Sequence, residues 1–198
     1  FLIFPEVVAA NFGVSNLCSF FRFNGTTFVP NTTCTSYAVG GGRVNNLSNA
    51  SAPSNAVPFS ITYQMAVGSA SLSANDLVII DGGGNDLADL TGAYLGATTP
   101  AGIATYMGML GTLLPPATVA AIIGTPTATS LGTAAGAYAQ AVGQTLAASI
   151  KANIVAKGVT KIVVINTPDI TATPRFLAVL SAVAAASGTA QRDAVKGA

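Results

Sequence analysis

Two short apolar runs stand out along this sequence, and stretches with helical periodicity separate them. The first run covers Leu77–Ile80 and the second Lys161–Asn166. Runs of this length, apolar at consecutive positions, are typical of parallel strands buried on both faces. Helical spacing of apolar residues is clearest over Thr133–Lys157. Alternation of strands and helices predicts an α/β protein with a parallel sheet.

Shorter patterns predict the remaining elements. A third strand is expected at Ser36–Val39, before three consecutive glycines. Further helices are expected at residues 5–11, 59–67, 86–94 and 103–114 and from Thr173 onward, and residues 14–35 are expected to form an irregular loop. Three strands are few for such a sheet, which indicates that the sheet is incomplete.

Composition adds limits on domain number and partners. A chain of 198 residues predicts a single domain, here with a low-complexity helical insertion rich in Ala, Thr, Gly and Pro at about residues 96–131. Net charge is +1 and charged residues are 8% of the chain, so no nucleic-acid partner is expected. The segment Leu90–Ile150 is uncharged, but its prolines and glycines interrupt it, and we expect no transmembrane helix.

Cys18 and Cys34 lie in the irregular loop and are the only cysteines. Metal ligation and a reactive thiol are the functional alternatives to a disulfide. Two cysteines in a chain without histidine cannot complete a four-ligand zinc site unless carboxylates contribute. We favour a disulfide, which would close a loop of about 16 residues and stabilise the fold by roughly 3 kcal/mol, and would indicate an oxidising compartment.

The strongest chemical signal follows the first apolar run. Three glycines and an Asn-Asp pair occupy residues 82–86. In an open α/β sheet, ligands bind at the carboxyl ends of the strands, and Asn85 there offers the neutral N–H donor that an oxyanion hole uses. The structural alternative is a strand-to-helix turn that Asn85 or Asp86 caps. We favour the cap for Asp86.

The chain contains no histidine. Histidine is the usual general base of a serine hydrolase, because its pKa lies near neutrality. The sequence therefore holds part of a hydrolytic site without its base.

Three motifs in order resemble the GDSL or SGNH hydrolases, which are lipases and esterases with a flavodoxin-like three-layer α/β fold. They are Tyr37–Val44 with its three glycines, Gly83–Asp86, and Val163–Ile170 followed by Thr173-Pro174. Residues 4–9, Phe-Pro-Glu-Val-Val-Ala, are also similar to the family's Trp-Pro-Glu-x-x-Ala helix. The likeness is greatest to secreted bacterial members with a disulfide-bridged loop.

The resemblance implies that a backbone N–H of Gly41, or of Gly40 in the other register, and the Asn85 side chain bind the oxyanion. The family's Gly-Asp-Ser-Leu nucleophile motif and its Asp-x-x-His motif are absent. We therefore expect the chain to be a central fragment of such an enzyme. Asp169 is expected in a turn rather than as a catalytic acid, and Arg43 is expected to anchor its loop.

These observations predict part of a secreted or periplasmic bacterial ester hydrolase. Its substrate would be a small-molecule or lipid ester, and neither a metal nor an organic cofactor is implied. The start of the sequence shows no signal-peptide pattern, and oligomeric state is not predicted. The alternative is a non-catalytic module that binds carbohydrate or a protein partner.

Overall fold

The computed structural model describes residues 3–14, 17–47, 56–167, 169 and 172–197. These residues form a mixed α/β structure that divides into two compact units. Unit 1 comprises residues 1–82 and 145–166, and unit 2 comprises residues 83–144 and 167–198. Helix α6 (Ala128–Asn153) begins in unit 2 and ends in unit 1.

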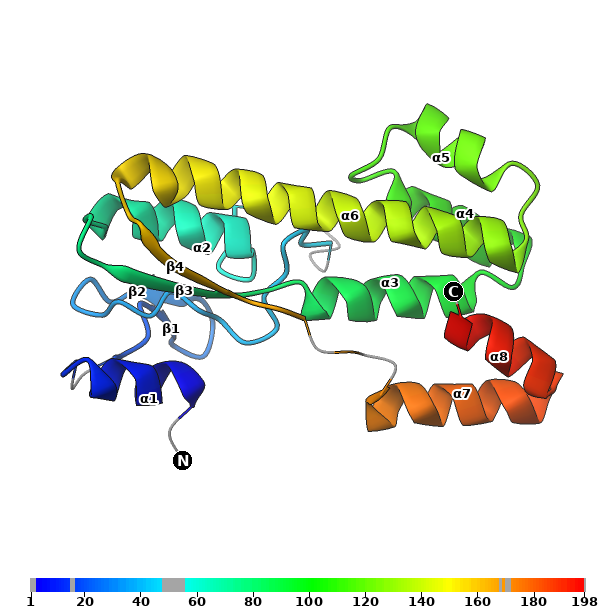
Figure 1. The fold of residues 1–198 in the computed structure, drawn as a ribbon, viewed down its shortest axis with the longest axis horizontal. Helices are drawn as coiled ribbons and strands as arrows, with labels where there is room; N and C mark the ends of the chain where they lie inside the picture. The colour runs from blue at the N-terminus through cyan, green and yellow to red at the C-terminus, as the bar shows by residue number, and fades with distance from the viewer. Residues whose placement is uncertain (1–2, 15–16, 48–55, 168, 170–171, 198) are drawn as a thin grey trace. The chain divides into compact units, whose positions relative to one another are not determined.

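Unit 1 contains the sheet that the apolar runs predict. Strand β3 (Leu77–Asp81) pairs with β4 (Lys161–Ile165) in parallel, with Leu77 opposite Lys161 and Asp81 opposite Ile165 (Figure 1). Both strands therefore end at the same edge. Helix α2 (Ile61–Gly68) lies where a helix is expected, and the Ser60 hydroxyl caps it by accepting a hydrogen bond from Tyr63 N–H.

The other elements of unit 1 are short. They are α1 (Phe4–Asn11), β1 (Phe21–Phe23), β2 (Phe28–Pro30) and two 3-10 turns at Ser69–Ser71 and Val155–Lys157. Cys18 and Cys34 form the predicted disulfide, with Cα atoms 5.0 Å apart. The disulfide joins the chain before β1 to the chain after β2.

Two expectations for unit 1 are wrong. Residues 14–35 are not wholly irregular, because β1 and β2 form an antiparallel hairpin. The Asn24 side chain builds its turn by accepting hydrogen bonds from Thr26 and Thr27 N–H. Conversely, Ser36–Val39 is not a strand: Ser36 makes one bridge, to Ser19, and the chain then enters the glycine turn.

Burial of β4 also differs from expectation. Its run Ile162–Ile165 is apolar, yet Val163 is 44% and Val164 is 49% exposed. Neighbouring residues of a strand point to opposite faces. Thus β4 is open on both faces, whereas its pattern predicts a strand covered on both.

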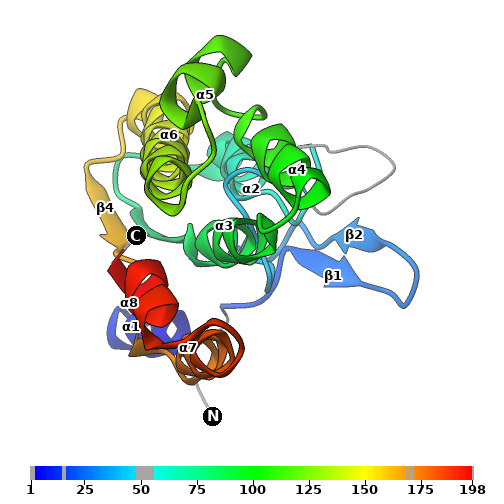
Figure 2. The same cartoon turned by 90° about the vertical axis from the view of Figure 1, so that its right-hand side faces the viewer.

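Unit 2 is helical. It contains α3 (Gly84–Gly96), α4 (Pro100–Leu110), α5 (Pro116–Ile123), the first part of α6, α7 (Pro174–Ser187) and α8 (Thr189–Gly197) (Figure 2). The low-complexity stretch holds α4 and α5. Its prolines begin these helices, because proline at the first helical position costs no hydrogen bond.

The core of unit 2 is built around aromatic and branched side chains. Tyr106 and Tyr138 are almost fully buried, together with Leu110 and Val119. The Tyr106 hydroxyl donates to the Leu131 carbonyl oxygen at 2.8 Å, which satisfies its polar atom inside the core. No helix among the described residues is long and apolar enough to cross a membrane.

Candidate oxyanion site

The glycines after Val39 form a tight turn. Gly42 N–H donates to the Val39 carbonyl oxygen at 3.1 Å, and Gly41 has φ +80° at the third position of the turn. A residue with a side chain is strained at that φ, so glycine is the residue suited to this position. Gly41 is exposed, and its N–H finds no acceptor among the described residues.

Arg43 fastens this turn to helix α2. Its Nη1 donates to the Gly41 carbonyl oxygen at 2.8 Å, as the anchoring prediction requires. Its backbone N–H donates to the Phe59 carbonyl oxygen at 2.9 Å, and its own carbonyl oxygen accepts from Ile61 N–H at 2.8 Å. The turn is therefore held from both sides, by its own arginine and by the start of α2.

Ile61 packs against two glycine segments at once. A Cβ built on Gly42 would lie 3.3 Å from Ile61 Cγ1 and 3.3 Å from Gln64 Nε2. A Cβ built on Gly82, immediately after β3, would lie 2.6 Å from Ile61 Cδ1. The Ile61 side chain fills the space that either Cβ would need. The first glycine turn and the end of β3 therefore both lie against this one side chain.

Sequence reasoning missed the role of Ile61, which lies within the helix expected at residues 59–67. The available signal was the presence of two three-glycine clusters, one after Val39 and one after Asp81. Gln64 contributes to the same packing, and its Nε2 donates to the Pro58 carbonyl oxygen at 2.7 Å. Because Gln64 is buried and its amide is hydrogen-bonded, its side chain is held in place beside Gly42.

The second glycine segment leads into α3. Gly83 has φ +99° and occupies the N-cap position, so neither Asn85 nor Asp86 is the N-cap residue. Capping of the first-turn amides by the Asp86 carboxylate stays a prediction. Both residues lie in the first turn, where backbone N–H groups lack intrahelical acceptors and a carboxylate is favourable. Asn85 is exposed, whereas Asp86 is 2% exposed, and both take part in interactions.

The predicted donors fall in different units. Gly41 belongs to unit 1 and Asn85 to unit 2. Each has a defined local geometry, and their convergence on one oxyanion stays a prediction. The Asp169 carbonyl oxygen accepts a hydrogen bond from Ala172 N–H at 3.3 Å, and its place in a turn stays a prediction. Its neighbours Pro168, Ile170 and Thr171 are outside the described residues.

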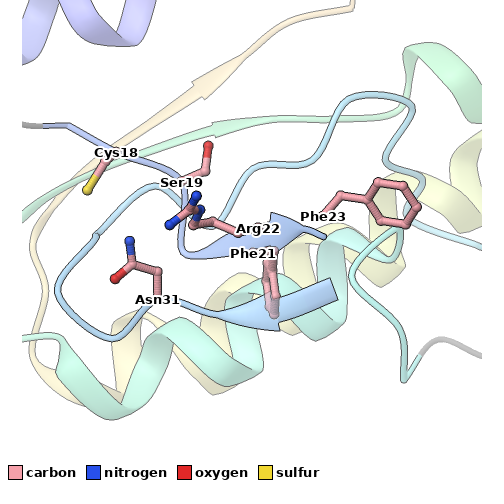
Figure 3. Close-up of a pocket in the computed structure, with 6 residues that line it drawn as sticks. All are labelled: Cys18, Ser19, Phe21, Arg22, Phe23 and Asn31. Atoms are coloured by element: carbon pink, nitrogen blue, oxygen red, sulfur yellow. The ribbon is translucent and has the colours of Figure 1, made fainter. Parts of the chain in front are cut away.

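A shallow depression of about 490 Å³ lies beside the disulfide of unit 1 (Figure 3). Its lining residues are Cys18, Ser19, Phe21, Arg22, Phe23 and Asn31. Arg22 is the charged member, and none of the six is a predicted oxyanion donor. Within the described part of the chain, no group of three or more Cys, Asp or Glu side chains is placed to hold a metal ion.

Comparisons of the chain with protein-family models, with characterised proteins and with solved structures found no match.

Proposed function

We propose that this chain is part of a carboxylic ester hydrolase of the SGNH type and that it supplies oxyanion donors. The observation that carries the proposal is the packing of Ile61 against both Gly42 and Gly82. It joins the turn that contains Gly41 to the strand end from which the chain continues into Asn85. An oxyanion hole for a tetrahedral acyl intermediate uses two such N–H donors, here proposed to come from the turn that contains Gly41 and from the residues that follow β3.

The proposed reaction is acyl transfer. A serine hydroxyl attacks the ester carbonyl carbon while a histidine accepts the hydroxyl proton. The carbonyl oxygen becomes an oxyanion, to which Gly41 N–H and the Asn85 side-chain amide donate. Removing one such donor typically costs about 3 to 4 kcal/mol of transition-state stabilisation. Collapse of the intermediate expels the alcohol, and water then releases the acid.

The proposal sets requirements on the rest of the enzyme. Because these 198 residues contain no histidine, the base must come from polypeptide outside them. The nucleophile is expected there too, because the Gly-Asp-Ser-Leu motif is absent. The substrate would be a small-molecule or lipid ester, and the Cys18–Cys34 disulfide favours a secreted or periplasmic setting.

The test uses the longer product encoded by the sequence flanking these residues. Asn85→Ala should lower kcat for a short-chain chromogenic ester by about 10²- to 10³-fold, with little change in KM or thermal stability. Asn75→Ala is the matched control: Asn75 is also an exposed asparagine, but it precedes β3 instead of following it. We expect this variant to keep the kcat of the unmodified enzyme.

Two results would contradict the proposal. The first is a longer product that hydrolyses the ester with unchanged kcat after Asn85→Ala. The second is flanking sequence that contains neither a Gly-Asp-Ser nor an Asp-x-x-His motif. The second result would favour the alternative of a non-catalytic binding module.

A further inference from the structure

The side chain of Ile61 contacts two backbone segments that lie far from it in the sequence. A Cβ on Gly42 would be 3.3 Å from Ile61 Cγ1, and a Cβ on Gly82 would be 2.6 Å from Ile61 Cδ1. Cβ contacts below 3.0 Å essentially do not occur in proteins. The end of β3 can therefore approach Ile61 this closely only because residue 82 is a glycine.

Ile61 is itself held in a fixed position. It is the first residue of α2, its N–H donates to the Arg43 carbonyl oxygen at 2.8 Å, and Ser60 caps the helix. A β-branched side chain has one strongly preferred χ1 rotamer in a helix. Because Ile61 is only 5% exposed, its end methyl group cannot turn into solvent. A side chain held in this way fixes how closely the two glycine segments approach it.

We propose that Ile61 is a positioning residue, whose side chain holds the first glycine turn and the end of β3 at the separation that the oxyanion donors need. Gly42 directly follows the proposed donor Gly41. The other proposed donor, Asn85, lies three residues after Gly82. The inference rests on the proposed function and adds that the size of one buried side chain controls its rate. A misplacement of about 1 Å, even far from the chemistry, can lower a rate by about 10²-fold.

The two contacts use different atoms of Ile61, so substitutions can separate them. Ile61→Val removes Cδ1, which faces Gly82, and keeps Cγ1, which faces Gly42. Gly82→Ala adds a methyl group close to the place of Cδ1. In the double variant this methyl group would lie 3.7 Å and 3.8 Å from the Cγ2 and Cγ1 positions of residue 61, which is ordinary van der Waals contact. The double variant therefore moves one methyl group across the contact and should restore it.

The value of kcat for the chromogenic ester, measured in the longer product, tests the positioning role. Gly82→Ala should lower kcat by about 10- to 100-fold and Ile61→Val by about 3- to 10-fold. KM should stay within about twofold, because the donors act on the transition state. The double variant should return to within about threefold of the unmodified kcat. Ile154→Val is the matched control: Ile154 is also a buried isoleucine of unit 1, and its loss of a methyl group should leave kcat unchanged.

Thermal unfolding of the 198-residue chain measures the same contact without any activity. Ile61→Val and Gly82→Ala should each lower Tm by about 2 to 6 °C, and the double variant should lie within about 2 °C of the unmodified chain. Ile154→Val should lower Tm about as much as Ile61→Val, so that these two variants differ in kcat and not in stability. If Gly82→Ala does not fold, recovery of folding in the double variant reports the contact and Ile61→Val reports its effect on kcat.

Two results would overturn the inference. Tm changes that simply add in the double variant would show that residues 61 and 82 do not contact each other. In a product whose kcat depends on Asn85, an Ile61→Val variant that keeps the kcat of Ile154→Val would show that Ile61 is only part of the core. The second result leaves the proposed function intact. A longer product without ester hydrolysis would contradict the proposed function and, with it, this inference.

Discussion

Two glycines of α4 differ strongly in the space that is available for a side chain. A Cβ on Gly102 would overlap the backbone carbonyl oxygen of Gly96, at the contact between α3 and α4. A Cβ on Gly108 would meet nothing within 4 Å. The sequence alone cannot distinguish these two glycines, because the difference depends on a neighbouring element.

Alanine substitutions should therefore have opposite effects at these two positions. Gly102→Ala should destabilise the protein by about 1 to 3 kcal/mol, because the backbone must shift. Gly108→Ala should stabilise it by about 0.5 to 1 kcal/mol, because alanine loses less entropy in a helix than glycine. Urea unfolding followed by circular dichroism measures both, and a loss of stability in the Gly108 variant would refute the packing described for α4.

Burial of Tyr106 makes the stability of the protein depend on pH. Burial, reinforced by the nearby Tyr94, raises the pKa of its hydroxyl above the ordinary value of 10.0. In the unfolded chain the hydroxyl ionises near pH 10, whereas the folded protein keeps it protonated. Its contribution to stability is therefore fully present below pH 10 and is lost as the pH rises through the folded-state pKa.

Tyr106→Phe removes the hydroxyl, so it should isolate the contribution of this group to the free energy of unfolding. At pH 7 the variant should lose about 1 kcal/mol, the value of the hydrogen bond to Leu131. Between pH 10 and 11 the unmodified protein should lose up to about 1.4 kcal/mol more per pH unit than the variant. Unfolding free energies measured from pH 7 to 11 test the slope. Parallel profiles for the two proteins would show that Tyr106 ionises equally in the folded and unfolded states.

At the scale of elements, the disulfide and the hairpin form one structure. Cys18 precedes β1 and Cys34 follows β2, and Asn31 Nδ2 donates to Cys34 Sγ at 3.0 Å. Few apolar side chains of the hairpin are buried: Phe21 lies in the core, while Phe23 and Val29 are exposed. The covalent link therefore has to supply stability that packing does not.

The double variant Cys18→Ser/Cys34→Ser should lower the unfolding free energy by roughly 3 kcal/mol, as expected for a loop of about 16 residues. Treating the unmodified protein with a reductant should lower its unfolding free energy by the same amount and leave that of the double variant unchanged. Mass spectrometry of unreduced peptides checks the pairing directly. Two alkylatable thiols in natively exported protein would contradict it.

The elements that could be predicted from sequence are those whose pattern is long or apolar. Strands β3 and β4 and helices α2 and α6 lie close to their predicted ranges. The β1–β2 hairpin was missed although Asn24-Gly25 is a common turn signal, because its strands are only three residues long. Helix α5 was missed because its prolines indicate a break as readily as a helix start.

At the scale of the whole chain, the site could be predicted only in part. Motifs single out Gly41 by its turn and Asn85 by its place after a strand, and their roles as oxyanion donors stay predictions. They could not identify Ile61, because its importance comes from contacts with glycines 19 positions before it and 21 after it. The chain also passes repeatedly between the two units, at residues 82–83, 144–145 and 166–167. Local patterns do not encode such long-range arrangements.

The 198-residue chain by itself should not hydrolyse esters above background. Acyl transfer to serine needs a base near neutral pH, and the chain has no histidine. Oxyanion donors alone lower the barrier only when a nucleophile is placed to attack, and no Gly-Asp-Ser-Leu motif is present. Purified protein should therefore show no saturable turnover of a p-nitrophenyl ester and no labelling by a fluorophosphonate probe.

The controls decide between an inactive chain and an unfolded one. Circular dichroism must show helix content consistent with α2–α8 before a negative result counts. Saturable hydrolysis that copurifies with folded protein, and that Asn85→Ala reduces but Asn75→Ala does not, would mean that a nucleophile and base exist within these residues. The seven aspartate and glutamate side chains would then be the first candidates for a general base.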